Sequence, residues 1–302
     1  MENHETLKAR LRAAGIAYKE QEPLAAHTTF KIGGPAAVFV QPAGEAQLCR
    51  AAALCRELAV PCYLLGNGSN ILFGDRGYAG AVVSLAGMKG EVRREGDTLT
   101  APAGMPLSVL CTAALRAGLT GLEFAYGIPG TVGGAVYMNA GAYGGEMKDV
   151  LLSVRYLTAE GQIEEAPAAA LDLGYRHSIF ESNGGCILSA AVGLAPGDPG
   201  AIAARMNDLM GRRRDKQPLD KPSAGSTFKR PVGAFAGALI EQCGLRGHRH
   251  GGAAISEKHC GFVVNLGGAT CADVLALCSE VQQIVKEQTG FVLEKEIRVV
   301  EL

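Results

Sequence analysis

The sequence predicts a fold of mixed helices and strands divided between two domains. The chain of 302 residues is long enough for two domains with a well-buried core. Its 48% apolar and 20% charged residues are typical of a globular protein. Segments with apolar residues on one helical face alternate with short apolar strands. A Gly- and Pro-rich segment at 195–200 is the clearest linker and marks the expected domain boundary.

The first part of the chain alternates helical and extended patterns. Leu48, Ala51 and Cys55 recur at the spacing of one helical face, and Pro61 follows the end of that helix. The expected elements are a helix and tether over 1–22, a turn over 28–35, a strand over 37–40, a helix over 44–58, a strand over 62–65 and several short strands over 71–104.

Helices dominate the later part of the chain. Thr270 and Asp273 form a capping box at the start of a long apolar face. Another helix begins at Pro106 and ends at Gly118, the usual positions of these residue types. The expected helices cover 106–118, 201–213, 233–243 and 270–288, and the expected strands cover 150–158, 186–194, 262–266 and 291–300.

Composition excludes several classes of partner. The net charge is −1 and the basic cluster at 212–216 is short, so we expect no nucleic acid. No apolar run reaches membrane-spanning length, and the N-terminus lacks the apolar core of a signal peptide. The nine cysteines include no C-x-x-C pair, which favours reduced thiols and no metal site. We therefore expect a cytoplasmic protein.

Two glycine-rich stretches are the strongest functional signal. Residues 127–145 read GIPGTVGGAVYMNAGAYGG, and residues 66–70 read GNGSN directly after an expected strand. Glycine lets the backbone turn through positive φ and present N–H groups to an anion, and it disfavours helix or strand interiors. Two such loops indicate a long ligand with a diphosphate, such as a dinucleotide, although ordinary tight turns are the alternative. Neither stretch is the G-x-G-x-x-G of a nicotinamide-binding Rossmann domain, which we reject.

Three polar residues stand beside glycines or in an apolar strand. Arg176 lies in a loop, where functional residues are common, but it could simply pair with Asp172. Ser226 follows a glycine, which is also ordinary turn chemistry. Glu296 lies in the terminal strand and could belong to its solvated face. Reasoning from these residue types ends at a protein that binds a phosphate-bearing ligand.

The motifs together resemble the family of UDP-N-acetylenolpyruvoylglucosamine reductases. The resemblance runs through nearly the whole chain and follows the family's motif order. The chain looks like the shorter, type II branch, which lacks an inserted loop carrying a substrate-binding tyrosine. The motifs are HTTFKIGGPA (27–36), LLGNGSNIL (64–72), GIPGTVGGAVYMNAGAYGGE (127–146), GYRHSIF (174–180), RRDKQP (213–218), PSAGSTFKRP (222–231), LIEQCGLRGHRHGGAAISEKHCGFVVN (239–265) and LEKEIRVV (293–300).

The resemblance implies an α+β fold with a two-part FAD-binding domain of the vanillyl-alcohol-oxidase (PCMH) type and a smaller α+β substrate-binding domain. The implied divisions are an N-terminal helix and tether at 1–24, the FAD-binding domain at 25–196, the substrate-binding domain at 197–290 and a terminal strand with a catalytic glutamate at 291–302.

The resemblance also implies the cofactors. FAD binds through the glycine-rich loops, and NADPH is the reductant. The FAD is non-covalent, because neither loop contains histidine or cysteine. The implied FAD-binding residues are Gly66, Asn67, Gly68, Ser69, Asn70, Gly127, Ile128, Pro129, Gly130, Thr131, Gly133, Gly134, Asn139 and Ala140.

By motif match, the catalytic residues are Arg176, Ser226 and Glu296. Hydride from FAD to the vinyl carbon of an enolpyruvyl ether leaves negative charge on the neighbouring carbon and its carboxylate. Arg176 and Glu296 would stabilise that charge, and Ser226 would donate the final proton. For this role we expect burial beside other acids to raise the pKa of Glu296.

Substrate binding is implied for a second set of residues. Arg213 and Lys216 match positions near the UDP diphosphate, which would make the basic cluster an anion funnel instead of a solvated helix end. Lys229, His259 and Arg298 lie at further motif positions. Position 230 is Arg, where some relatives carry Asn, so a substrate contact there departs from the family pattern.

The implied function is NADPH-dependent reduction of UDP-N-acetylglucosamine enolpyruvate to UDP-N-acetylmuramate. Such a flavoprotein is an NADP-linked oxidoreductase of peptidoglycan synthesis, and thus of cell wall biogenesis, cell shape and cell division. The alternatives are another FAD oxidoreductase of the same fold, or a non-enzymatic protein that binds UDP-sugars. We expect a monomer.

Overall fold

The computed structural model describes residues 2–88 and 90–301 and divides the chain into two compact units. The first unit contains residues up to Lys19, Val38–Asn67 and Gly80–Arg213, and the second contains Glu20–Ala37, Gly68–Ala79 and the chain from Arg214 onward. The chain therefore passes between the units several times. The functional domain limits given above stay a prediction.

An N-terminal layer packs helices on a small sheet whose residues belong mostly to the first unit. The sheet has the order β1-β2-β5-β3, and β3 runs parallel to β5. Leu48, Leu54 and Cys55 are buried in its core, which confirms the expected helical face. The elements are α1 (Glu2–Ala13), β1 (Ala17–Pro23), β2 (Pro35–Gln41), α2 (Glu45–Glu57), β3 (Cys62–Leu65) and β5 (Tyr78–Ser84).

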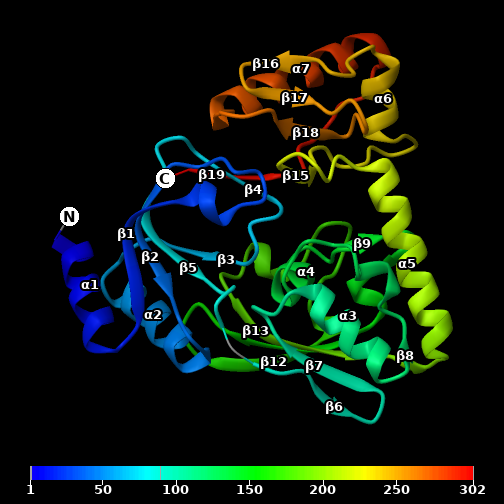
Figure 1. Cartoon of the computed structure of the whole chain (residues 1–302). Helices are drawn as coiled ribbons and strands as arrows, with labels where there is room; N and C mark the ends of the chain where they lie inside the picture. Colours follow the sequence, from blue (N-terminus) through cyan, green and yellow to red (C-terminus); the bar gives the residue numbers. More distant parts are fainter. Residues whose placement is uncertain (1, 89, 302) are drawn as a thin grey trace. The chain divides into compact units, whose positions relative to one another are not determined.

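A five-stranded antiparallel sheet forms the second layer of this unit. Its strand order is β12-β11-β13-β7-β6, and helices α3 and α4 pack against it (Figure 1). Leu107, Leu110 and Val136 from these helices are buried in one core with Leu99 and Val192 from the strands. The bounds are β6 (Arg93–Glu95), β7 (Thr98–Pro102), α3 (Leu107–Arg116), α4 (Val132–Tyr137), β11 (Leu151–Leu157), β12 (Ile163–Pro167) and β13 (Cys186–Gly193).

Smaller elements connect these layers. Two two-stranded ladders are present, β10 with β9 and β14 with β8. Their bounds are β8 (Leu119–Thr120), β9 (Gly141–Ala142), β10 (Gly145–Glu146) and β14 (Ala195–Pro196); the short 3₁₀ turns are η1 (Leu24–His27), η2 (Glu123–Ala125), η3 (Met147–Asp149), η4 (Ala168–Ala170) and η5 (Ile179–Glu181).

The second unit is a four-stranded antiparallel sheet with helices on it. The strand order is β15-β18-β17-β16, and α7 lies along β16 and β17 (Figure 1). A further pair, β19 with β4, is parallel. The bounds are β4 (Ile71–Phe73), β15 (Ser223–Ser226), α6 (Ala236–Gln242), β16 (Arg249–His250), β17 (Ala253–Ile255), β18 (Phe262–Asn265), α7 (Cys271–Thr289) and β19 (Arg298–Val300), with α5 (Pro199–Lys216) leading in from the first unit.

The capping box of α7 forms as expected. The Thr270 hydroxyl accepts from the Asp273 N–H at 3.0 Å, and the Asp273 carboxylate accepts from the Thr270 N–H at 3.0 Å. The helix ends at Gly290, whose φ of 77° is left-handed. These two ends explain why the sequence predicted this helix closely.

The glycine-rich stretch corrects one expectation, because part of it is helical. Helix α4 begins after Thr131, whose hydroxyl accepts from the Gly134 N–H at 3.2 Å. A Cβ on Gly133 would lie 2.7 Å from the Ala103 Cβ. Glycine is therefore required here by close packing of a helix on β7, and the short helix tolerates its weak propensity.

Three other expectations also need correction. The tether expected before residue 22 is strand β1. The linker expected at 195–200 contains β14 and the first turn of α5. The terminal strand expected over 291–300 is limited to β19 plus an isolated bridge between Lys295 and Phe228. For the strands, pairing with a distant segment decides the outcome, and the periodicity of the sequence does not identify that segment.

Among the described residues, no helix combines the length and apolar character that crossing a membrane requires. All nine cysteines are free thiols, as expected.

Candidate active site

The two glycine-rich stretches meet in the first unit. The Asn67 side-chain amide donates to the Pro129 carbonyl at 2.6 Å. A Cβ on Gly66 would lie 2.8 Å from the Thr131 hydroxyl oxygen, so glycine at 66 leaves room for the loops to approach. This cradle of closely spaced backbone fits a diphosphate-bearing cofactor, because bulk is absent where the cofactor's chain would pass.

The second half of GNGSN lies in the second unit. Gly68 has a φ of 61°, and a Cβ there would lie 2.3 Å from the His27 carbonyl oxygen. The Asn70 amide donates to the Glu296 carbonyl at 3.3 Å, and the Asn70 carbonyl accepts from the Arg298 N–H at 3.0 Å. The predicted cofactor loop and the predicted catalytic glutamate are therefore neighbours in this unit.

Ser226 and Glu296 also lie on adjacent segments of the second unit. The Glu296 N–H donates to the Thr227 carbonyl at 2.8 Å, and the Lys229 N–H donates to the Glu294 carbonyl at 2.8 Å. Thr227 is fully buried, and its hydroxyl accepts from the Val263 N–H at 2.9 Å. This ladder fixes the backbone of Glu296 beside the end of β15, where Ser226 lies after the left-handed Gly225.

Arg176 lies in the first unit at the tip of a tight turn. Gly174 and His177 exchange backbone hydrogen bonds at 3.2 and 3.3 Å, which leaves Tyr175 and Arg176 between them. Arg176 has a φ of 55°, an uncommon value for a side chain of this kind. Both terminal guanidinium nitrogens lie 3.4 Å from the Gly141 carbonyl oxygen.

The residue after Arg176, His177, pairs with two nearby carboxylates. His177 contacts the Asp172 carboxylate at 3.1 Å and the Glu181 carboxylate at 2.7 Å. The hydrogen bond to Glu181, then that to Asp172, raises the pKa of His177. Asp172, which the sequence suggested as a partner for Arg176, therefore pairs with His177.

Asn139 is buried and its amide is engaged within the protein. Its side-chain nitrogen donates to Glu146 Oε2 at 2.7 Å and to the Gly174 carbonyl at 2.9 Å. Its side-chain oxygen accepts from the Lys148 N–H at 2.9 Å. A contact of Asn139 with the cofactor stays a prediction. Its side-chain amide nitrogen already donates to two acceptors within the protein.

The predicted substrate-binding residues fall in both units. Arg213 lies in the first unit, with its Nη1 3.0 Å from the place of a Cβ on Gly127. Burial lowers the pKa of Arg213, and the nearby Tyr143 partly opposes this shift. Lys216, Lys229, His259 and Arg298 lie in the second unit. Of these, Lys229 pairs with Glu294 at 3.5 Å on the surface.

His259 is the most constrained member of this set. Its Nδ1 accepts from the Gly261 N–H at 3.1 Å, and its ring meets Phe262 edge-on at 5.0 Å. Burial is the main cause that lowers the pKa of His259, with Arg246 and Lys216 adding to it. A neutral ring that accepts at Nδ1 carries its hydrogen on Nε2 and can donate from there.

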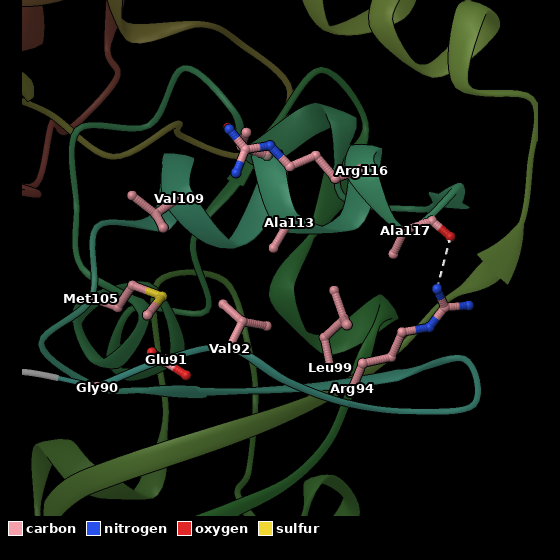
Figure 2. A pocket seen from close by; sticks show the side chains of 11 residues that line it. Gly90, Glu91, Val92, Arg94, Leu99, Met105, Val109, Ala113, Arg116 and Ala117 are labelled. Atoms are coloured by element: carbon pink, nitrogen blue, oxygen red, sulfur yellow. Dashed lines mark hydrogen bonds between the residues drawn. The ribbon is translucent and has the colours of Figure 1, made fainter.

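A pocket of about 640 Å³ lies elsewhere in the first unit (Figure 2). Val92 and Leu99 from the β6–β7 hairpin face Ala113 of α3 across it (Figure 2). The predicted site residues are not among its lining. Met105 in its lining contacts the glycine-rich stretch, because its carbonyl accepts from the Val132 N–H at 2.8 Å. Within residues 2–88 and 90–301, no group of three or more His, Cys, Asp and Glu could hold a metal ion.

Sequence reasoning missed one buried residue beside the site. Ser178 is fully buried, and its hydroxyl donates to the Tyr137 carbonyl at 2.7 Å. The available signal was a serine between His177 and two apolar residues, in a motif already singled out.

Comparison with known proteins defines the class first. Residues 36–166 match the model of an FAD binding domain. Residues 217–300 match the C-terminal domain of UDP-N-acetylenolpyruvoylglucosamine reductase. With glycine loops that fit a dinucleotide, these matches define an FAD-dependent oxidoreductase.

Full-length relatives then give the family. The chain is 46% identical over 291 residues to UDP-N-acetylenolpyruvoylglucosamine reductase of Clostridium perfringens, with 95% of each chain covered. It is 48% identical over 281 residues to the enzyme of that name from Clostridioides difficile, covering 93% of this chain and 92% of the relative. The crystal structure of the reductase from Thermus caldophilus matches with a TM-score of 0.79 and 36% identity, over 95% of this chain and 99% of that one. The chain belongs to the family of UDP-N-acetylenolpyruvoylglucosamine reductases. The expected family, FAD cofactor and α+β fold with a PCMH-type FAD-binding domain are confirmed.

Proposed function

We propose that this protein reduces UDP-N-acetylglucosamine enolpyruvate to UDP-N-acetylmuramate with NADPH, in the synthesis of peptidoglycan precursors. The observation that carries the proposal is the adjacency of Ser226, Glu296 and the Asn70 loop in the second unit. A proton donor and an acid beside a cofactor loop are what reduction of an enolpyruvyl double bond requires.

FAD would be held by the cradle of Gly66–Asn67 and Pro129–Thr131, with Gly68–Asn70 as a further contact. When bound, FAD supplies the group that takes hydride from NADPH and delivers it to the vinyl carbon. The protein supplies the backbone N–H groups that stabilise the cofactor's diphosphate.

Arg176 and Glu296 would stabilise the negative charge that develops on the substrate. The planar guanidinium of Arg176 can hold a carboxylate with two parallel hydrogen bonds, which a lysine cannot reproduce. Glu296 would donate a hydrogen bond when protonated, and the raised pKa that this needs stays a prediction.

Ser226 would deliver a proton to the carbon that carried the charge. An unactivated serine is a poor acid, so it needs a neighbour that restores its proton. Glu296 on the adjacent segment, or a water molecule, would serve in this way.

The substrate's diphosphate would be bound by Arg213 and Lys216, and its remaining polar groups by Lys229, His259 and Arg298. A neutral His259 would donate from Nε2, as its contact with Gly261 supports. We also propose that the protein acts as a monomer without nucleic acid.

The test separates the two half-reactions under anaerobic conditions. Limiting NADPH should bleach the yellow protein, and the enolpyruvyl substrate should restore its colour. In Ser226→Ala the bleaching rate should stay unchanged, while recolouring slows by about 10²–10⁴-fold. Ser223→Ala in the same strand is the matched control and should behave as the unaltered protein.

Three outcomes would contradict the proposal. Equal slowing of both half-reactions in Ser226→Ala would remove its role as proton donor. A protein that bleaches but never recolours would be another FAD oxidoreductase of the same fold. A protein that binds UDP-sugars but is not reduced by NADPH would be a non-enzymatic binding protein.

A further inference from the structure

We propose that Asn139 and Ser178 are positioning residues that together fix the turn carrying Arg176. The inference rests on the proposed role of Arg176 toward the substrate carboxylate. Both residues connect that turn to the segment at the end of helix α4, so they act on the guanidinium through the backbone.

The two anchors lie on either side of Arg176. Asn139 donates to the carbonyl of Gly174, two residues before Arg176, at 2.9 Å. Ser178, two residues after Arg176, donates to the Tyr137 carbonyl at 2.7 Å. The turn is therefore held at both ends by a segment more than 30 residues away in the sequence.

Both anchors are shielded from water. The exposed fraction of Asn139 is 1% and that of Ser178 is 0%. A buried hydrogen bond is retained more strongly than an exposed one, because breaking it leaves polar groups without solvent. The anchors are thus suited to hold a fixed geometry.

Arg176 benefits from such support because its backbone holds an uncommon conformation. Its φ of 55° is a conformation that glycine adopts readily and arginine rarely does. Its guanidinium lies 3.4 Å from the Gly141 carbonyl, at the long limit of a hydrogen bond. Its guanidinium carbon also lies 5.5 Å from the centroid of the Tyr175 ring, so the turn carries both the side chain and this contact.

A second contact fixes the orientation of the Asn139 amide. Glu146 accepts from its side-chain nitrogen at 2.7 Å and pairs with Lys148 Nζ at 2.6 Å. The Lys148 N–H donates to the Asn139 side-chain oxygen. The nitrogen and oxygen of the amide cannot exchange places without facing groups of the wrong kind.

The test uses Asn139→Gly, Asn139→Asp and Ser178→Ala. Asn139 has a φ of 38°, so glycine removes the side chain and tolerates the backbone conformation. Aspartate keeps the shape but turns a carboxylate oxygen toward Glu146 and the Gly174 carbonyl. The matched controls are Asn183→Asp, where only the side-chain oxygen bonds to Gly185, and Ser182→Ala on the exposed surface.

We expect Ser178→Ala to keep its flavin content and its rate of reduction by NADPH, whereas the flavin content of the Asn139 variants reports separately on the predicted cofactor contact of Asn139, so their rates are compared per bound flavin. Recolouring by substrate should slow by about tenfold to a hundredfold, the usual effect of a misplaced catalytic group. In the Arg176→Ala background, the same changes should have no additional effect, since they act through Arg176. The controls should match the unaltered protein.

A second readout needs no turnover. Limited trypsin digestion followed by mass spectrometry should show faster cleavage after Arg176 in the anchor variants than in the controls, because the turn opens more often. Unchanged cleavage would overturn the proposal, as would additive effects with Arg176→Ala, or loss of flavin in Ser178→Ala.

Failure of the proposed function would look different. If Arg176→Ala leaves recolouring unchanged, the role of Arg176 is wrong and the anchor variants should also leave it unchanged. Faster tryptic cleavage would then still support the anchors themselves.

Discussion

The predicted role of Arg176 depends on an uncommon value of its backbone angle φ. The residue sits at left-handed φ in a two-residue turn, a position that glycine would fill with less strain. Residues held in such conformations cost about 1–3 kcal/mol and persist when their surroundings determine them. Here the hydrogen bonds from Asn139 and Ser178 are the surroundings that hold the turn.

The pKa of His259 predicts a pH dependence of stability. Burial lowers this pKa in the folded protein, so the unfolded chain takes up a proton at higher pH than the folded chain. The contribution of His259 to the free energy of unfolding is present above its pKa in the unfolded chain, about 6.5. It is lost as the pH falls through the lowered pKa of the folded protein. In denaturant unfolding from pH 7 to pH 5, His259→Asn should lose less stability than the unaltered protein.

His177 provides the control of opposite sign. Hydrogen bonds to Glu181 and Asp172 raise the pKa of His177. Its contribution to the free energy of unfolding is therefore present at low pH and is lost as the pH rises through the pKa of the folded protein. His177→Asn should therefore steepen the loss of stability on acidification. The same slope in both variants would contradict the assignment of His259.

At the scale of elements, helix α4 predicts different outcomes for two adjacent glycines. A Cβ on Gly133 would lie 2.7 Å from the Ala103 Cβ, whereas one on Gly134 would meet nothing closer than 3.4 Å. Gly133→Ala should destabilise the protein by about 1–3 kcal/mol through overpacking. Gly134→Ala should be neutral or slightly stabilising, because alanine is the better helix former.

Thermal unfolding and flavin content of the two alanine variants would check this prediction. Equal melting temperatures would show that Ala103 can move away, and that the glycine at 133 serves the cofactor instead of packing.

Elements with their own signals could be predicted from the sequence. Helix α7 was recognisable because Thr270, Asp273 and Gly290 mark its ends. Strand β1 and the short extent of β19 were not, because a strand is defined by a distant partner: Arg298 pairs with Ile71. Motifs name Arg176 and Ser226 as candidate site residues, which stays a prediction, but no local pattern connects Asn139 to Gly174.

Across the whole molecule, the thiols should fall into two reactivity classes. Burial raises the pKa of Cys111, Cys186 and Cys278 to about 12, so these thiols stay protonated and unreactive. Only Cys49, Cys62 and Cys243 are at least partly accessible. Titration with an aromatic disulfide reagent should label at most three thiols in the native protein and nine after unfolding.

Fast labelling of more than three native thiols would contradict this distribution of burial. A Cys243→Ser variant should lower the native count by one and leave the six buried thiols unlabelled.

The order in which the chain passes between its units also affects how it folds during synthesis on the ribosome. Strand β4 pairs with β19, so Ile71 emerges more than 200 residues before its partner Arg298. At about 5–20 residues per second, that interval lasts roughly 10 to 45 seconds. The first unit ends at Arg213 and can begin to fold early, while β4 must wait for β19 at the end of the chain. During synthesis the hydrogen-bonding edge that β4 offers to β19 therefore stays without this partner until the chain is nearly finished.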